Sequence, residues 1–107
     1  MINNVKKDEI SRIVEYVKAN SIIYNKLTVI GKCTTNEATI DDILELVVKL
    51  NPDYVKDNKS QMYDLMCIID DITEGNFNLI VDSGHLTNST LQEISEGVTI
   101  YEYLQKT

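Results

Sequence analysis

Residues 59–84, KSQMYDLMCIIDDITEGNFNLIVDSG, contain both kinds of regular structure that decide the fold class. The first part repeats apolar residues at the spacing of one helix face, namely Met62, Leu65, Met66, Ile69 and Ile72. We therefore predict a helix over about 59–74, ended by Gly75, because glycine commonly follows the last turn of a helix. Residues 78–82, NLIVD, then form a short apolar run closed by Ser83-Gly84, which predicts a strand.

Two segments nearer the N-terminus have equally regular patterns. Residues 8–20 place apolar side chains at the i, i+3, i+4 and i+7 positions of a helix, namely Ile10, Ile13, Val14 and Val17. Residues 27–30, LTVI, are short, rich in β-branched side chains and ended by Gly31. The first segment predicts a helix and the second a strand.

Residues 39–50 have the pattern of a capped helix. Thr39 precedes Asp42 at the spacing of a capping motif, in which a side-chain oxygen accepts a free backbone amide. Helical spacing follows at Ile40, Ile43, Leu44, Val47 and Leu50. Pro52 disfavours helix in the residue before it, so we predict a helix over 40–50.

The last part of the chain has a weaker pattern. Asn88 or Ser89 is placed to cap a short helix that carries Leu91 and Ile94. Residues 98–103, VTIYEY, have strand propensity but also continue a loose helical spacing, and we assign them to a strand. The segments together predict an α+β fold, a single globular domain over residues 1–107 with three to four helices packed on a small two- or three-stranded sheet.

The charge of the chain is divided unevenly along its length. Residues 1–59 contain nine acidic and nine basic side chains, whereas residues 60–107 contain eight acidic side chains and one lysine. The second part therefore accounts for the net charge of −7. Charge asymmetry of this kind steers association with partners but does not define a fold or a reaction.

Helix geometry gathers half of these eight carboxylates on one predicted helix. A rotation of about 100° per residue places Tyr63, Cys67, Asp70 and Glu74 along one outer stripe, with Asp64 and Asp71 beside it. Two interpretations remain open for this stripe. It is either a solvated face that maintains solubility or a docking face for a basic partner, in which Asp82, Glu93, Glu96 and Glu102 could also take part.

The chain lacks the sequence patterns of several site classes, and we predict that it is not an enzyme. Two cysteines, Cys33 and Cys67, and one histidine, His85, are too few for a structural zinc site, and the acidic residues do not follow the spacing of a calcium loop. The isolated glycines form no phosphate-binding loop. The run Asp82-Ser83-Gly84-His85 is better explained as a turn than as a catalytic group, because residues adjacent in sequence seldom reach catalytic geometry. We therefore expect no catalytic residue, metal or cofactor.

We expect neither nucleic acid nor a membrane as a direct partner. A pI near 4.5 and a single arginine do not supply the phosphate-neutralising surface of a nucleic-acid reader. No window of the sequence approaches the ~20 apolar residues of a membrane span. The N-terminal residues are polar, so we expect no secretory signal, and the free thiols are typical of a reducing cytoplasm.

The leading functional hypothesis is a non-enzymatic, acidic protein-interaction module. It would use Tyr63, Asp64, Asp70, Asp71, Glu74 and Glu102 to cover a basic surface of a nucleic-acid-handling protein. Its size and charge are typical of inhibitors encoded by phages and mobile elements, of the anti-CRISPR or anti-restriction type. The alternatives are a toxin immunity protein, or a small regulatory or structural subunit that forms homodimers and whose acidity serves only solubility.

Overall fold

The computed structural model describes residues 6–53, 58–82 and 84–102. Its elements in chain order are α1 (Lys7–Ala19), β1 (Tyr24–Ile30), the short 3-10 helix η2 (Gly31–Thr34), β2 (Leu44–Leu50), α2 (Asn58–Thr73), β3 (Phe77–Val81), α3 (Asn88–Glu96) and β4 (Val98–Glu102). The predicted α+β class is confirmed. The described residues form a sheet of four strands, more than the two or three predicted, and three α-helices.

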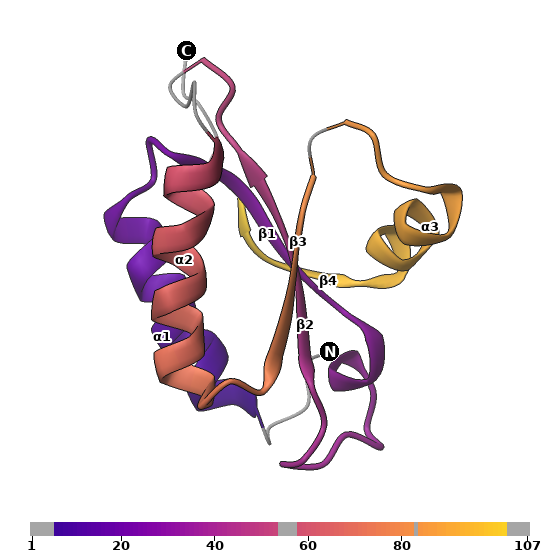
Figure 1. The fold of residues 1–107 in the computed structure, drawn as a ribbon. Helices are drawn as coiled ribbons and strands as arrows, with labels where there is room; N and C mark the ends of the chain where they lie inside the picture. The colour runs from indigo at the N-terminus through magenta and orange to yellow at the C-terminus, as the bar shows by residue number, and fades with distance from the viewer. Residues whose placement is uncertain (1–5, 54–57, 83, 103–107) are drawn as a thin grey trace.

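The sheet is mixed and has the order β3-β2-β1-β4. Strand β1 pairs antiparallel with both β2 and β4, while β2 and β3 are parallel. The helix α2 makes the crossover between these parallel strands, as their geometry requires. Figure 1 shows α1 and α2 side by side on one face of the sheet and α3 on the other. The molecule therefore has one well-covered sheet face and one that α3 covers only in part.

The hydrophobic core lies between the sheet and the pair of helices α1 and α2. Ile13 and Val17 of α1 and Leu65 and Ile69 of α2 are fully buried, as the predicted helix stripes require. They pack against alternate residues of the strands, among them Leu27, Val29, Leu46, Val48 and Tyr101. Alternation arises because successive side chains of a strand point to opposite faces of the sheet. The predictions of helices at 8–20 and 59–74 and of strands at 27–30 and 78–82 are confirmed.

The predicted helix over 40–50 is wrong, because residues 44–50 form the central strand β2. Leu44, Leu46, Val48 and Leu50 are all buried at every second position, which is the period of a strand. Val47 points to the other face and is also buried, at 4% exposure. Glu45 and Lys49 on that face are half-buried and exposed, so Val47 alone extends the apolar pattern there, and together with Leu44 and Leu50 it also satisfies helical spacing.

The cap predicted at Thr39 and Asp42 is also wrong, because the Asp42 carboxylate, and not the Thr39 hydroxyl, accepts the hydrogen bond, and the contact closes a turn that no helix follows. The Thr39 backbone N–H donates to Asp42 Oδ2 at 2.6 Å, and the Asp42 N–H donates to the Thr39 carbonyl at 3.1 Å. Lys32 Nζ lies 3.3 Å from Asp42 Oδ1. The hydrogen bond from the Thr39 amide, followed by the interactions with Lys32, lowers the pKa of Asp42 below its ordinary 3.8.

This contact predicts a pH-dependent contribution to stability. A lowered pKa in the folded state stabilises the fold above the ordinary value of 3.8, and the contribution is lost as pH falls through the lower folded-state value. We expect Asp42→Ala to reduce stability at neutral pH and the gap from the wild type to narrow in acid. Urea denaturation of both proteins across this range measures the gap, with the exposed Asp41→Ala as control. A gap that stays constant in acid would contradict the assignment.

The short helix and the strand predicted for the C-terminal part are both present, but the residue that caps the helix differs from the prediction. Thr87, and not Asn88 or Ser89, caps α3, since its side chain accepts a hydrogen bond from the Thr90 N–H at 3.3 Å. The strand assigned to 98–103 is confirmed as β4, Val98–Glu102. Tyr103 lies outside the described residues.

Candidate interaction surface

The predicted acidic stripe lies on the solvent side of α2. Tyr63, Cys67, Asp70 and Glu74 are all exposed, and so are Asp64 and Asp71 beside them. We call these six residues the α2 outer face. Tyr63 is the one large aromatic side chain among these six residues, and 66% of its surface is exposed. Within the part of the chain that the structure describes, none of the four aspartates and glutamates forms an ion pair.

The stripe continues past the helix because the chain turns sharply at its end. Glu74 has a left-handed φ of 55° and Gly75 has a φ of 82°. The Gly75 N–H donates to the Asp70 carbonyl at 3.0 Å and the Asn76 N–H donates to that of Thr73 at 3.2 Å, which satisfies the last turn. This cap holds Glu74 at the negative end of the helix dipole. The negative potential is therefore strongest at this end of α2.

The two cysteines have opposite environments, in the order that the sequence predicts. Cys33 is buried and donates to the Ile43 carbonyl at 3.3 Å, and burial raises its pKa above 9.0. Cys67 is exposed on the α2 outer face. A hydrogen bond with the Cys67 side chain raises the pKa of Tyr63 above 10.0. A phenol and a thiol thus lie side by side among the carboxylates of the α2 outer face.

The outward side chains of α2 divide between two flanks. Helix geometry puts Met62 and Met66 on the flank opposite Asp64, because both lie about 160° from Asp64 around the helix axis. Beneath the helical layer, burial and then the neighbouring Tyr16 raise the pKa of Tyr24, and the Tyr16 ring of α1 packs edge-on against Tyr24 at 6.3 Å.

A cleft of about 490 Å³ extends the acidic surface at the end of α2. Its lining comes from α1, the turn before β2 and the α2 terminus, and comprises Lys6, Glu9, Ile40, Asp41, Ile72, Thr73, Glu74 and Asn76. The Lys6 ammonium is buried, donates to the Ile40 carbonyl at 2.9 Å and lies 3.8 Å from Glu9. Three carboxylates against this one ammonium leave the cleft negative.

Sequence reasoning missed Glu9 and Asp41 as members of this surface. Both lie in the half of the chain whose charges cancel, and only the packing of α1 and the 38–43 turn beside α2 brings them to Glu74. Ile40 stands at the same cleft with 71% of its surface exposed. An exposed isoleucine beside carboxylates gives the surface an apolar contact as well as charge.

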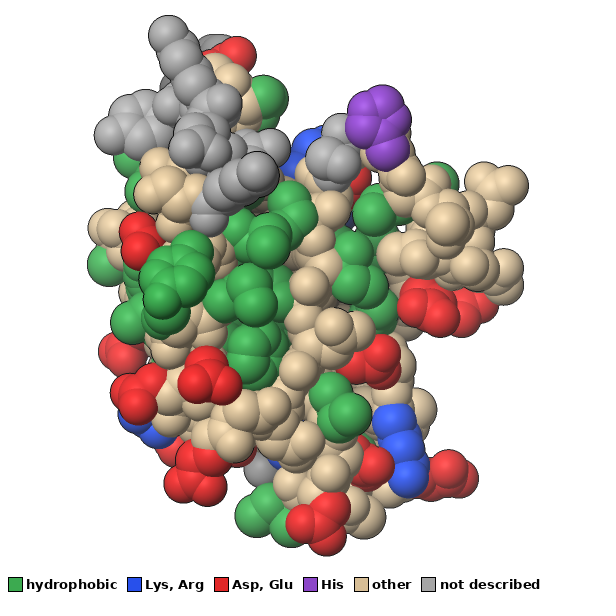
Figure 2. Space-filling model, viewed as in Figure 1, with side chains coloured by type: hydrophobic (Ala, Val, Ile, Leu, Met, Phe, Trp, Pro, Cys, Tyr) green, Lys and Arg blue, Asp and Glu red, His purple; other side chains and the backbone are tan. Residues whose placement is uncertain are grey.

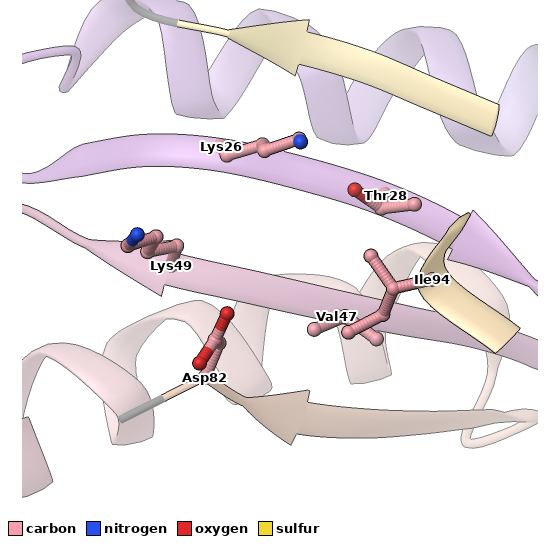
Figure 3. Close-up of a pocket in the computed structure, with 6 residues that line it drawn as sticks. All are labelled: Lys26, Thr28, Val47, Lys49, Asp82 and Ile94. Carbon is pink, nitrogen blue, oxygen red and sulfur yellow. The ribbon is translucent and has the colours of Figure 1, made fainter. Parts of the chain in front are cut away.

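A second, smaller concavity of about 90 Å³ lies on the other face of the sheet, beneath α3 (Figure 3). Lys26 and Lys49 stand directly opposite each other on β1 and β2. Asp82 lines the same concavity, and Lys26 Nζ lies 3.9 Å from Glu102. Across the sheet, the Lys49 and Lys26 ammonium groups thus lie between the carboxylates of Asp82 and Glu102. We call these four residues the charged row. Its net charge is zero, and no local sequence pattern predicts it.

Glu102 belongs to this charged row and lies far from the other residues predicted to bind a partner. Glu102 pairs with Lys26 on the α3 face of the sheet, whereas the α2 outer face lies across the helical layer on the opposite face. Glu93 and Glu96 belong to α3 and are likewise remote from α2. Of the residues predicted to bind a partner, the structure brings together Tyr63, Asp64, Asp70, Asp71 and Glu74.

Of the residues considered for catalysis, Asp82 and His85 are among those that the structure describes. The Asp82 carboxylate accepts a hydrogen bond from the Gly84 N–H at 3.0 Å, the geometry of a turn, and His85 is exposed. Ser83 lies outside the described residues. Over residues 6–53, 58–82 and 84–102 no three His, Cys, Asp or Glu side chains are grouped so as to hold a metal ion. None of the helices in that part of the chain has the length and apolarity to cross a membrane.

No protein-family model matches the chain, and no curated protein has a matching sequence.

Proposed function

We propose that this chain is a non-enzymatic interaction module that binds a basic surface of another protein through the α2 outer face. The observation that supports the proposal is the set of four carboxylates on α2 and its C-terminal turn that form no ion pair among the described residues. Tyr63 and Ile40 flank them with exposed apolar area, and aromatic side chains are common at binding hot spots. Charge would steer the encounter, and the apolar groups would hold the complex.

The most suitable partner is a protein that handles nucleic acid. Such proteins present clustered lysines and arginines that neutralise phosphates. The carboxylates of the α2 outer face would occupy the positions of those phosphates, so that binding blocks the nucleic-acid site. This mechanism is that of a phage or mobile-element inhibitor of the anti-CRISPR or anti-restriction type, and it applies equally to the immunity protein of a nuclease toxin.

The test is a triple charge reversal, Asp70→Lys, Asp71→Lys and Glu74→Lys. We expect partner binding to weaken by about ten-fold or more, because repulsion replaces attraction at the contact. The matched control is Glu37→Lys, Glu93→Lys and Glu96→Lys, which changes the net charge equally but lies on exposed residues away from α2. Both variants are first checked for folding by circular dichroism.

Binding is measured by pull-down from host lysate at low and high salt, with the bound protein and nucleic acid identified. The wild type and the control should retain the same basic protein, and high salt should release it because exposed charges are screened. A folded triple variant that retains the partner would overturn the proposal. A homodimer held by apolar contacts would instead persist at high salt, and would support the regulatory or structural subunit.

A further inference from the structure

Strand β3 is an edge strand with an open hydrogen-bonding side. It stands last in the sheet order, and no described segment pairs with its outer side. The Asp82 N–H donates to the Val48 carbonyl, and the Asn76 carbonyl accepts from the Leu44 N–H, so the even-numbered residues face β2. The N–H and C=O groups of Phe77, Leu79 and Val81 therefore point outward, because these groups alternate along a strand.

This edge lacks the features by which natural sheets protect their edges. Residues 77–81, FNLIV, contain no charge and no proline, and their register with β2 is regular. The opposite edge differs, since β4 carries Glu102 and its register with β1 shifts between Leu27 and Thr28. Charge and irregular register both discourage pairing with another chain. Only β3 thus retains the properties of a strand that receives a partner.

The surroundings of the β3 edge are apolar on both sides of the backbone. Figure 2 shows green side chains to either side of the path that β3 follows in Figure 1. Leu79 and Val81 on the helix side and Ile80 on the other side are each only partly buried. Met62 and Met66 of α2 are also partly buried, on the flank of the helix opposite Asp64. Methionine adapts its shape to varied ligands, which suits a surface that a second chain covers.

The charges next to the edge indicate which chain could cover it. Asp70 lies on the same flank of α2 as Met66, and its Oδ1 is 3.4 Å from the position of a Cβ on Gly75, just before β3. In Figure 2 acidic side chains gather over α2 on this face, and few basic ones accompany them. A second copy paired edge to edge through β3 would bring two α2 outer faces side by side. Their like charges would repel, so charge complementarity favours a basic segment.

We propose that β3 accepts an extended, basic segment of the partner protein as a fifth strand of the sheet. This proposal rests on the proposed function and specifies the partner's contact. The backbone of the added segment would bond to Phe77, Leu79 and Val81. Its side chains alternate between the two faces, so lysine or arginine at every second position would meet Asp70 and Tyr63, and apolar residues would cover Ile80.

The probe for the test is a synthetic peptide that alternates lysine and valine and is long enough to span β3. The control peptide has the same sequence, charge and length but carries a methyl group on every backbone nitrogen, so it cannot donate the ladder hydrogen bonds in either strand direction. Amide hydrogen exchange of the full chain is followed by NMR. With the first peptide at about ten times its Kd, the outward amides of Phe77, Leu79 and Val81 should exchange about ten-fold more slowly.

The control peptide should shift the α2 signals without protecting these amides. The proposal is overturned if the alternating peptide shifts the α2 signals but leaves the exchange of Phe77, Leu79 and Val81 unchanged, and the proposed function then survives. It is also overturned if the amides become protected without peptide as protein concentration rises, because a second copy then occupies the edge. If neither peptide shifts the α2 signals, the strand proposal fails here, while the charge-reversal pull-down decides the proposed function separately.

Discussion

Leu46→Ala is expected to lower the free energy of unfolding by about 2–5 kcal/mol, the usual cost of truncating a buried leucine. Leu46 is fully buried at the middle of β2, which has a neighbouring strand on each side. It pairs with Val29 of β1 and Leu79 of β3, so the cavity would open between the sheet and both helices. Domains of this size are stable by about 5–15 kcal/mol in total, so the loss is a large fraction.

The matched control is Ile43→Ala, and the pair discriminates strand from helix. In a helix over 40–50 Ile43 would belong to the apolar stripe and Leu46 would not, so Ile43→Ala would be the costly change. In the structure Ile43 is 53% exposed, and its truncation should cost well under half as much as that of Leu46. Chemical denaturation of both variants measures the difference. Equal costs, or a larger cost at Ile43, would refute the strand β2.

Gly97→Ala is expected to destabilise the protein by about 1–3 kcal/mol through overpacking. A Cβ at this position would lie 2.5 Å from the Val29 carbonyl oxygen and 3.0 Å from Thr28 Cγ2. The obstacle is backbone of the central strand β1, which cannot rotate away as a flexible side chain could. The backbone of Gly97 itself, with a φ of −79°, is ordinary for any residue. The position therefore requires glycine for space, where α3 passes directly into β4.

Comparing substitutions of different size at Gly97 tests this explanation. Gly97→Val should destabilise more than Gly97→Ala, and faster amide exchange should appear in β1 and β4. Gly84 is the control, because its φ of 88° is left-handed while nothing lies within 4 Å of its Cβ position. Alanine at Gly84 should cost about 1–2 kcal/mol from backbone strain alone, without disturbing β1 and β4. A stable Gly97→Val variant would contradict the close approach of the two strands.

The predicted elements succeeded for two different reasons. Strand β1 is buried on both faces, but it is a short run rich in β-branched residues that ends at Gly31. The helices α1 and α2 each bury one stripe, so the apolar spacing of Ile13, Val17, Leu65 and Ile69 is sufficient to locate them. Strand β2 was missed for another reason. On its second face only Val47 is buried, but Val47 continues the helical spacing of Ile40, Ile43, Leu44 and Leu50, so two periods fit the same run. Which of two periods applies depends on the neighbours β1 and β3, and a local pattern does not contain them.

The candidate interaction surface was likewise predicted from the sequence only in part. The sequence by itself determined that Tyr63, Cys67 and Asp70 share a stripe, because the geometry of one helix fixes which of its residues share a face, whereas the turn after Thr73 places Glu74. Only the tertiary structure decided that Glu9 and Asp41 line the same cleft as Glu74. It also decided that Glu102 forms an ion pair with Lys26, on the other face of the sheet. It likewise decided that β3 is an edge. Strand order and packing between distant segments depend on how all the elements together bury one shared hydrophobic core. The sequence of a single segment does not contain that information.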